Sequence, residues 1–262
     1  MQQKVAIVTG GSGGIGKAAA SLLFKNGYTV YELSRHGADA DGVTHLTADV
    51  TDAASVNSAV ATVIEREGRI DLLVNNAGFG ISGAVECTSE ADAKAQFDVN
   101  FFGQLRCIQA VLPYMRKQRC GHIVNLSSVA APIAIPFQSF YSATKAAVNS
   151  LTLSLRNEAR PYGVQVCAVQ PGDVRTGFTA ARKKSAAGED VYPALAHAVA
   201  VMEHDEQTGM PPEAVARTIL RAASARRPRP LYTVGPKYRV FAVIAKFLPV
   251  RATNYLVGLI YR

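Results

Sequence analysis

The chain has 262 residues, of which 48% are hydrophobic and 18% charged, a composition typical of a globular protein with a sizeable core. This length suits one large α/β domain or two small ones. No apolar run is long enough for a membrane span, and the first residues, MQQKVAIVTGG, lack the pattern of a secretory signal, which predicts a cytoplasmic location. The four cysteines are scattered and form no C-x-x-C pair, so we expect reduced thiols and no metal site.

The net charge of +8 is concentrated at one end of the chain. No Asp or Glu follows Glu213, whereas ten Lys and Arg residues do, which leaves residues 1–213 with a net charge of −2. This distribution argues against a general nucleic-acid binder. It indicates instead one basic and apolar C-terminal segment.

Strands and helices alternate along the chain. In chain order, the hydrophobic patterns predict strand 4–10, helix 14–27, strand 28–34, strand 44–50, helix 51–68, strand 70–78, a helical stretch of about 90–118, strand 121–128, helix 140–160, strand 163–172, helix 211–224 and strand 230–235. Residues 173–210 are rich in small residues, and we expect an irregular, mobile lid there. The alternation implies a parallel sheet with helices on both faces, which binds ligands beyond the carboxyl ends of its strands.

A glycine-rich turn, TGGSGGIG, joins the first strand to the first helix. Its glycines permit a tight turn and a close approach of the backbone, and the helix N-terminus offers free N–H groups to a pyrophosphate. A turn of this kind is weak support when it stands alone. Its position after the first strand favours dinucleotide binding through Gly10, Ser12, Gly14, Ile15 and Gly16.

The end of the second strand, YELSRHG, indicates which dinucleotide is bound. Ser34 and Arg35 occupy the terminal positions, and a hydroxyl with a guanidinium would bind a ribose 2′-phosphate. We therefore expect NADP(H) in preference to NAD(H). The alternative is that Arg35 is a solvated loop residue and Glu32, inside the strand, reaches the ribose. Asp49 lies at the end of the third strand, next to Val50, and is a candidate partner for the adenine amine.

Four features together resemble the short-chain dehydrogenase/reductase family: TGGSGGIG, NNAG at 75–78, Ser128 in NLSSVAA, and YSATK at 141–145. The resemblance covers about residues 3 to 235. It implies a single Rossmann-type, doubly wound parallel sheet of about seven strands in the order 3-2-1-4-5-6-7, flanked by helices on both faces. Residues 1–235 would then form the dehydrogenase/reductase domain, with 236–262 as a basic amphipathic extension of the same domain or a lid or surface helix.

The resemblance also implies roles for individual residues. The catalytic set would be Asn100, Ser128, Tyr141 and Lys145, with Ser127 facing away from the site. NNAG and the loop PGDVRT, which resembles the family's loop at the nicotinamide side, complete the cofactor site. The cofactor-binding residues would be Gly10, Ser12, Gly14, Ile15, Gly16, Ser34, Arg35, Asp49, Val50, Asn76, Ala77, Gly78, Tyr141, Lys145, Pro171, Gly172, Val174 and Thr176.

Tyr141 and Lys145 lie four residues apart, so one helical turn places both side chains on the same face. For an isolated pair, the common reading is a half-packed Tyr beside a solvated Lys. Within the family, a nearby ammonium lowers the phenol pKa from about 10 toward neutral pH. Tyr141 then donates a proton to a carbonyl oxygen or removes one from an alcohol. Ser128 would orient that oxygen, and Asn100 would hold a water that links Lys145 to solvent.

The substrate is less well specified. The segment VAAPIAIPFQSF, residues 129–140, is small and apolar and predicts a hydrophobic ketone, aldehyde or secondary alcohol, although apolar loops also simply pack. The stretch VNFFGQLRCIQAVLPYMRK, together with the Ser-Arg at the second strand, is similar to the hydroxysteroid and retinol dehydrogenase-like branch, which implies a steroid- or retinoid-like substrate. The alternatives are reduction of a 3-oxoacyl thioester, a non-catalytic NADP(H)-binding sensor and a membrane-peripheral protein. Family members are commonly homodimers or homotetramers built on the two long helices, here 90–118 and 140–160.

The C-terminal segment, residues 236–262, has an amphipathic pattern. Phe241, Ile244, Ala245 and Leu248 fall on one helical face, and Pro249 interrupts the pattern before a second apolar turn. This segment either lies on an anionic membrane surface or packs on the domain or on a second subunit and covers the substrate pocket. The second reading is favoured by sequence alone.

Overall fold

The computed structural model of the protein describes residues 3–261, apart from the side chain of Lys246. Two of the basic groups expected in the C-terminal segment, Arg262 and the Lys246 side chain, therefore lie outside the described part. Within residues 3–261, no helix is both long and apolar enough to cross a bilayer.

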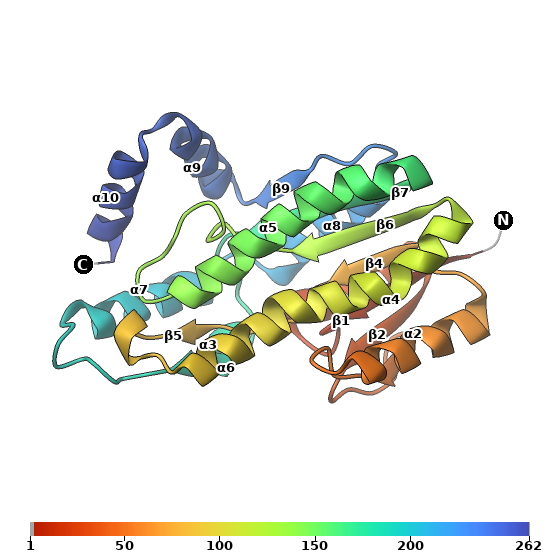
Figure 1. Cartoon of the computed structure of the whole chain (residues 1–262), viewed down its shortest axis with the longest axis horizontal. Coiled ribbons are helices and arrows are strands. Elements are labelled where there is room, and N and C mark those ends of the chain that lie inside the picture. Colours follow the sequence, from red (N-terminus) through yellow and green to blue (C-terminus); the bar gives the residue numbers. More distant parts are fainter. Residues whose placement is uncertain (1–2, 262) are drawn as a thin grey trace.

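The main sheet contains seven parallel strands in the order β3-β2-β1-β4-β6-β7-β9 (Figure 1). This confirms the predicted order, because β5 and β8 belong to a separate two-stranded sheet. The strands are β1 (Lys4–Thr9), β2 (Tyr28–Ser34), β3 (Val43–Thr47), β4 (Leu72–Asn75), β5 (Ile81–Ser82), β6 (Gly121–Leu126), β7 (Val164–Pro171), β8 (Lys183–Lys184) and β9 (Leu231–Val234).

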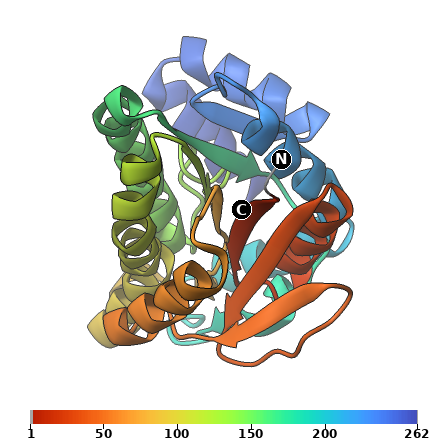
Figure 2. The same cartoon turned by 90° about the vertical axis from the view of Figure 1, so that its right-hand side faces the viewer.

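Helices cover both faces of the main sheet (Figure 2). The α-helices are α1 (Gly14–Lys25), α2 (Ala53–Glu67), α3 (Glu90–Phe97), α4 (Gly103–Gln118), α5 (Ser139–Ala159), α6 (Phe178–Ala181), α7 (Ala194–Gln207), α8 (Pro212–Ser224), α9 (Pro236–Phe247) and α10 (Val250–Ile260). A π-helical turn, η2 (Asp98–Phe102), joins α3 to α4, and short 3-10 turns are η1 (Val85–Cys87) and η3 (Arg160–Tyr162).

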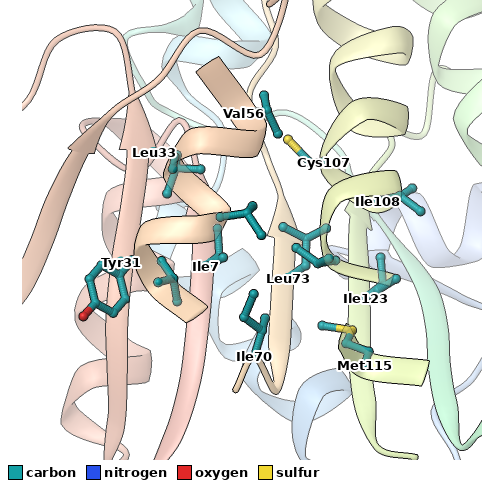
Figure 3. Close-up of a cluster of buried hydrophobic side chains, with 14 of the residues drawn as sticks. Ile7, Tyr31, Leu33, Val56, Ile70, Leu73, Cys107, Ile108, Met115 and Ile123 are labelled. Carbon is teal, nitrogen blue, oxygen red and sulfur yellow. The ribbon is translucent and has the colours of Figure 1, made fainter. Parts of the chain in front are cut away.

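Two apolar layers hold the helices against the sheet. On one face, Ile7, Leu73 and Ile123 from the strands pack with side chains of α2 and α4, such as Val56 and Met115 (Figure 3). The opposite face joins the sheet to α1 and α8 through a second buried cluster. The strands β1, β2, β4, β6 and β7 give buried apolar side chains to both clusters, as a covered parallel sheet requires.

Local sequence explains where these helices begin and end. The Asp52 side chain accepts a hydrogen bond from the Ala54 N–H at 2.9 Å and caps α2, while Gly68 ends it with φ +72°. At the end of α1 the capping residue is Asn26, and Gly27 follows it with φ +82°.

The prediction of an irregular segment at 173–210 was wrong. It contains α6, β8 and the fourteen-residue helix α7. Alanine is a strong helix former, and Leu195, Ala198 and Met202 are buried at helical spacing. This pattern is visible in the sequence, and the abundance of small residues hid it.

Candidate active site

A cleft of about 480 Å³ opens where β1, β4, β6 and β7 end, as expected for a parallel sheet of this type. The loops that follow these four strands all contribute residues to its lining, together with the first turns of α5. The lining includes most of the predicted site: Gly10, Ser12, Gly14, Ile15, Asn76, Ala77, Gly78, Ser128, Tyr141, Lys145, Pro171, Gly172, Val174 and Thr176.

The glycine-rich turn is held tightly against the end of β4. Gly10 and Gly14 adopt φ values of +65° and +51°, which glycine tolerates best. The Asn76 side chain donates hydrogen bonds to the carbonyls of Thr9 at 3.0 Å and Gly10 at 3.2 Å. A Cβ on Gly16 would lie 2.2 Å from the Gly10 oxygen, so only glycine fits there.

The same turn has room for a ligand on its outer side. A Cβ built on Gly13 meets no atom within 4 Å, and Gly13 lines the cleft at the N-terminus of α1. Free N–H groups at that terminus suit a pyrophosphate. The residues present therefore fit a nicotinamide dinucleotide.

Tyr141 and Lys145 project from the first two turns of α5 into the cleft. The Lys145 Nζ donates a hydrogen bond to the Leu126 carbonyl at 2.9 Å and lies 5.5 Å from the centre of the Tyr141 ring. Burial lowers the pKa of Lys145 to about 8. Burial raises the pKa of Tyr141 to about 12, against the lowering expected from the nearby ammonium, and among the described residues only its hydrogen bond with Ser128 and the charge of Arg182 work in the opposite direction.

The two neighbouring serines point in different directions. Ser128 shares a hydrogen bond with the Tyr141 phenol, and its Oγ also accepts the Ala130 N–H at 3.1 Å. Ser127 instead donates to the main-chain carbonyl of Lys145 at 3.1 Å. Ser128 therefore faces the phenol, while Ser127 ties β6 to α5.

Asn100 lies in the π-helical turn η2 and is fully buried. Its side chain accepts the Phe79 N–H at 3.0 Å and donates to the Phe79 carbonyl at 2.9 Å. It also donates to the Thr144 hydroxyl at 3.3 Å, which connects η2 to α5. π-helical turns are common at functional sites. Here the turn places Asn100 where its side chain fixes the backbone of Phe79, beside Gly78. The side chain is engaged with protein groups, and the relay water expected at Asn100 stays a prediction.

The residues expected at the adenosine end do not line the 480 Å³ cleft. The Ser34 hydroxyl donates to Glu32 at 3.1 Å and to the His36 carbonyl at 3.0 Å, and Arg35 is exposed. A second hollow of about 720 Å³ adjoins the glycine-rich turn and is lined by Gly11, Glu32 and Gly37 among others. The buried Glu32 Oε2 has no hydrogen-bond partner within the described residues, so the alternative in which Glu32 reaches the ribose stays open.

Asp49 and Val50 follow β3 rather than ending it, because the strand stops at Thr47. Asp49 accepts hydrogen bonds from the Thr51 N–H at 2.9 Å and hydroxyl at 2.8 Å. These bonds, led by the backbone one, lower the Asp49 pKa, and Arg35 lowers it further. Arg35 and Asp49 therefore lie within electrostatic range of each other at the expected adenosine end.

Sequence reasoning missed an acidic and aromatic group at the other end of the cleft. Asp173, Phe178 and Glu206 all line it. The Phe178 ring meets the Tyr141 ring edge to face at 5.7 Å. Glu206 accepts the Thr179 hydroxyl at 2.7 Å and pairs with the fully buried Arg182 side chain. Glu206 was missed because it belongs to α7, the helix that was not predicted.

Asp173 connects the cleft to the C-terminal helices. The Tyr238 hydroxyl donates a hydrogen bond to it, and Lys237 Nζ lies 3.9 Å away. Burial raises the Asp173 pKa, against the opposing effects of Tyr238 and Lys237.

The family profile described as short chain dehydrogenase matches residues 4–187, well over half of the chain. The chain belongs to the short-chain dehydrogenase family. This short-chain dehydrogenase is 39% identical over 266 residues to a 3-ketodihydrosphingosine reductase of Bacteroides thetaiotaomicron, covering 100% of this chain and 99% of that protein. The predicted hydroxysteroid branch is not specifically shown by these similarities.

Solved structures of the family superpose closely on this dehydrogenase. One from Streptomyces avermitilis has a TM-score of 0.81 and 31% identity, covering 93% of this chain and 94% of that one. ElxO with NADP bound has a TM-score of 0.76 and 27% identity, covering 91% and 100%. A family member from Burkholderia phymatum in complex with NAD has a TM-score of 0.79 and 26% identity, covering 94% and 92%. Both cofactors thus occur among the neighbours, which leaves the preference of this chain open.

Proposed function

We propose that this oxidoreductase uses NADPH to reduce the ketone of a long-chain amino alcohol, of the 3-ketodihydrosphingosine type, to a secondary alcohol. The observation that carries the reaction type is the meeting of Ser128, Tyr141 and Lys145 in one cleft beside a nucleotide-binding turn. The similarity to the Bacteroides reductase, which spans the full length of both chains, supports the substrate class.

The catalytic side chains suit carbonyl reduction. When bound, the reduced nicotinamide supplies the hydride. Tyr141 is protonated at neutral pH because burial raises its pKa to about 12, so it holds the proton that a ketone oxygen needs. Ser128 hydrogen-bonds the phenol and is placed to share the same carbonyl oxygen. The Lys145 ammonium, 5.5 Å from the phenol ring, stabilises the phenolate that remains after proton transfer.

The polar end of the cleft suits a substrate that carries an amine. Asp173 and Glu206 line it, and the Asp173 pKa is raised by burial. An ammonium group beside the ketone would favour the ionised form of Asp173 and be attracted to it, whereas Glu206 is already paired with Arg182. A steroid or retinoid, or a 3-oxoacyl thioester, brings no cation to this place, and these substrates are therefore the weaker candidates.

The preference for NADPH rests on Ser34 and Arg35 at the end of β2. Arg35 is exposed beyond the strand, and a guanidinium there would pair with a 2′-phosphate. Glu32 is the competing partner, since its buried oxygen would accept a ribose hydroxyl of NADH. We expect Arg35→Ala to raise the KM for NADPH about tenfold and to leave the KM for NADH nearly unchanged.

The function is tested by following the reduced nicotinamide absorbance with NADPH and, separately, NADH. The substrates are 3-ketodihydrosphingosine, a steroid ketone, retinal and an acetoacetyl thioester. We expect the amino ketone to react fastest with NADPH, and Tyr141→Phe to lower kcat at least about 100-fold. Tyr162→Phe, at an exposed position, is the matched control and should keep full activity.

Each other outcome identifies an alternative. Faster turnover of the thioester or the steroid would replace the amino ketone as substrate class. Tight NADPH binding without turnover of any of the four would favour a non-catalytic sensor. A lower KM for NADH would assign the ribose to Glu32 and overturn the Arg35 proposal.

We further propose a homodimer or homotetramer in the cytoplasm, with no nucleic-acid partner. The proposal of an oligomer rests on exposed apolar side chains of the two long helices, including Tyr114 on α4 and Leu153 on α5.

A further inference from the structure

The C-terminal helix pair, α9 and α10 with the turn between them (residues 236–260), exposes an unusual amount of apolar surface. Of the sixteen large hydrophobic residues found exposed in the described part of the chain, nine lie on this pair, which is about a tenth of the sequence. Such a concentration marks an interaction surface, because single exposed hydrophobic residues are ordinarily scattered. The nine are Val240, Val243, Ile244, Phe247, Val250, Tyr255, Leu256, Leu259 and Ile260.

The pair is attached to the domain along one side only. Val257 of α10 is buried. The Tyr238 ring of α9 packs closely on Gly172, because a Cβ built on Gly172 would lie 2.1 Å from that ring. The pair follows β9 and stands beyond that end of the sheet (Figure 1). The favoured reading from sequence is that the apolar face packs on the domain or on a second subunit, and packing on the domain does not account for the outer side chains.

Among the exposed large hydrophobic residues of the pair, those beside the turn between the two helices are the most exposed. Phe247 and Val250 are 85% and 84% exposed, and they flank Leu248 and Pro249, where α9 ends and α10 begins. The turn thus presents an apolar tip. An element with this shape suits shallow insertion into the headgroup region of a bilayer.

The charged residues from 214 onward are all basic, whereas Asp173 and Asp205 of the domain share a hollow with Lys237 at the start of α9. No Asp or Glu occurs after Glu213, and Lys237, Arg239 and Arg251 are exposed on the pair itself. The exposed Arg217 and Arg221 of α8 line the same hollow as Lys237 and Arg239 and add to this charge. Basic side chains next to an apolar tip complement an anionic lipid surface.

We propose that the C-terminal helix pair docks this protein on anionic lipid bilayers, with Phe247 and Val250 entering the headgroup region. The charge complementarity favours this occupant over a second copy of the chain, whose matching surface would be equally basic.

Docking would also bring the catalytic cleft to the lipid surface. Tyr238 of α9 contacts Gly172 and hydrogen-bonds Asp173, and both of these residues line the cleft. A long-chain ketone could then pass from bilayer to cleft without crossing bulk water. This last consequence rests on the proposed function, whereas the docking itself does not.

The test is co-sedimentation of the full chain, without cofactor, with vesicles of phosphatidylcholine alone or with 30% phosphatidylglycerol. We expect binding to the anionic vesicles that weakens as salt is raised. The double variant Phe247→Glu with Val250→Glu should lose at least tenfold in binding, and Arg251→Glu should lose less. Val191→Glu, at a position 61% exposed outside the pair, is the matched control and should bind like the parent chain.

Three results would overturn the docking surface. The first is equal vesicle binding by the double variant and the Val191→Glu control. The second is the absence of vesicle binding by the parent chain. The third is a change of the double variant to a smaller oligomer in light scattering, which would assign the surface to a second copy. Thermal melts verify folding. Because vesicle binding needs no turnover, its failure leaves the proposed reduction untouched, and failure of the reduction leaves the docking result valid.

Discussion

At the scale of a single residue, Lys145 is expected to lower the stability of the fold while it serves the reaction. Its ammonium is buried, and burial lowers its pKa from 10.5 to about 8. At pH 7 the group is still mostly charged, so the folded protein carries the cost of a desolvated cation. The Leu126 carbonyl that it contacts also accepts a hydrogen bond from Gln104, and removal of the ammonium leaves no orphaned acceptor.

We therefore expect Lys145→Met to raise the free energy of unfolding at pH 7, by up to about 3 kcal/mol, while turnover is lost. Because the pKa of Lys145 is lower in the folded than in the unfolded state, the parent chain gains stability as pH rises from about 8 to 10.5. The advantage of the variant should shrink over the same range. Thermal melts at pH 7, 8.5 and 10 measure this, with exposed Lys117→Met as the control. A variant less stable than the parent chain at pH 7 would contradict it.

At the scale of elements, the active site depends on the contact between the glycine-rich turn and the end of β4. A Cβ on Gly16 would lie 2.2 Å from the Gly10 oxygen and 2.6 Å from the Asn76 amide nitrogen. We expect Gly16→Ala to separate α1 from β4, to cost about 1–3 kcal/mol of stability and to weaken NADPH binding more than tenfold. Fluorescence titration and thermal melts measure both effects. Gly13→Ala, which meets nothing within 4 Å, is the stability control, and equal destabilisation by the two variants would refute the steric argument.

At the scale of the whole molecule, the long helices α4 and α5 lie side by side on one face (Figures 1 and 2). They expose Tyr114 and Leu153, which a partner subunit would cover. We expect Leu153→Glu to halve the mass seen by light scattering, because a buried unpaired charge disfavours association. Val191→Glu on another surface should leave the mass unchanged. An unaltered mass for both variants would place the subunit interface elsewhere.

Most of the fold was predictable because its signals are local. The buried runs of β1 and β7 and the caps of α2 are legible in short windows of sequence, and alternation of strand and helix then permits few topologies. The helix α7 was equally local, but its alanines were read as loop residues. The two-residue strands β5 and β8 carry no pattern of their own, since they exist only by pairing across the chain.

The sequence by itself determined the family, the order of the strands and the residues that meet at the end of the sheet, because motif spacing and strand alternation act over short distances. Tertiary structure alone decided that Glu206 enters the cleft beside Tyr141 and that Phe247 and Val250 are left uncovered. Each of these depends on packing between segments far apart in the chain. The free energy of such packing comes from the apolar surfaces that are buried against each other. A short window of sequence does not indicate which distant surface a given side chain will contact.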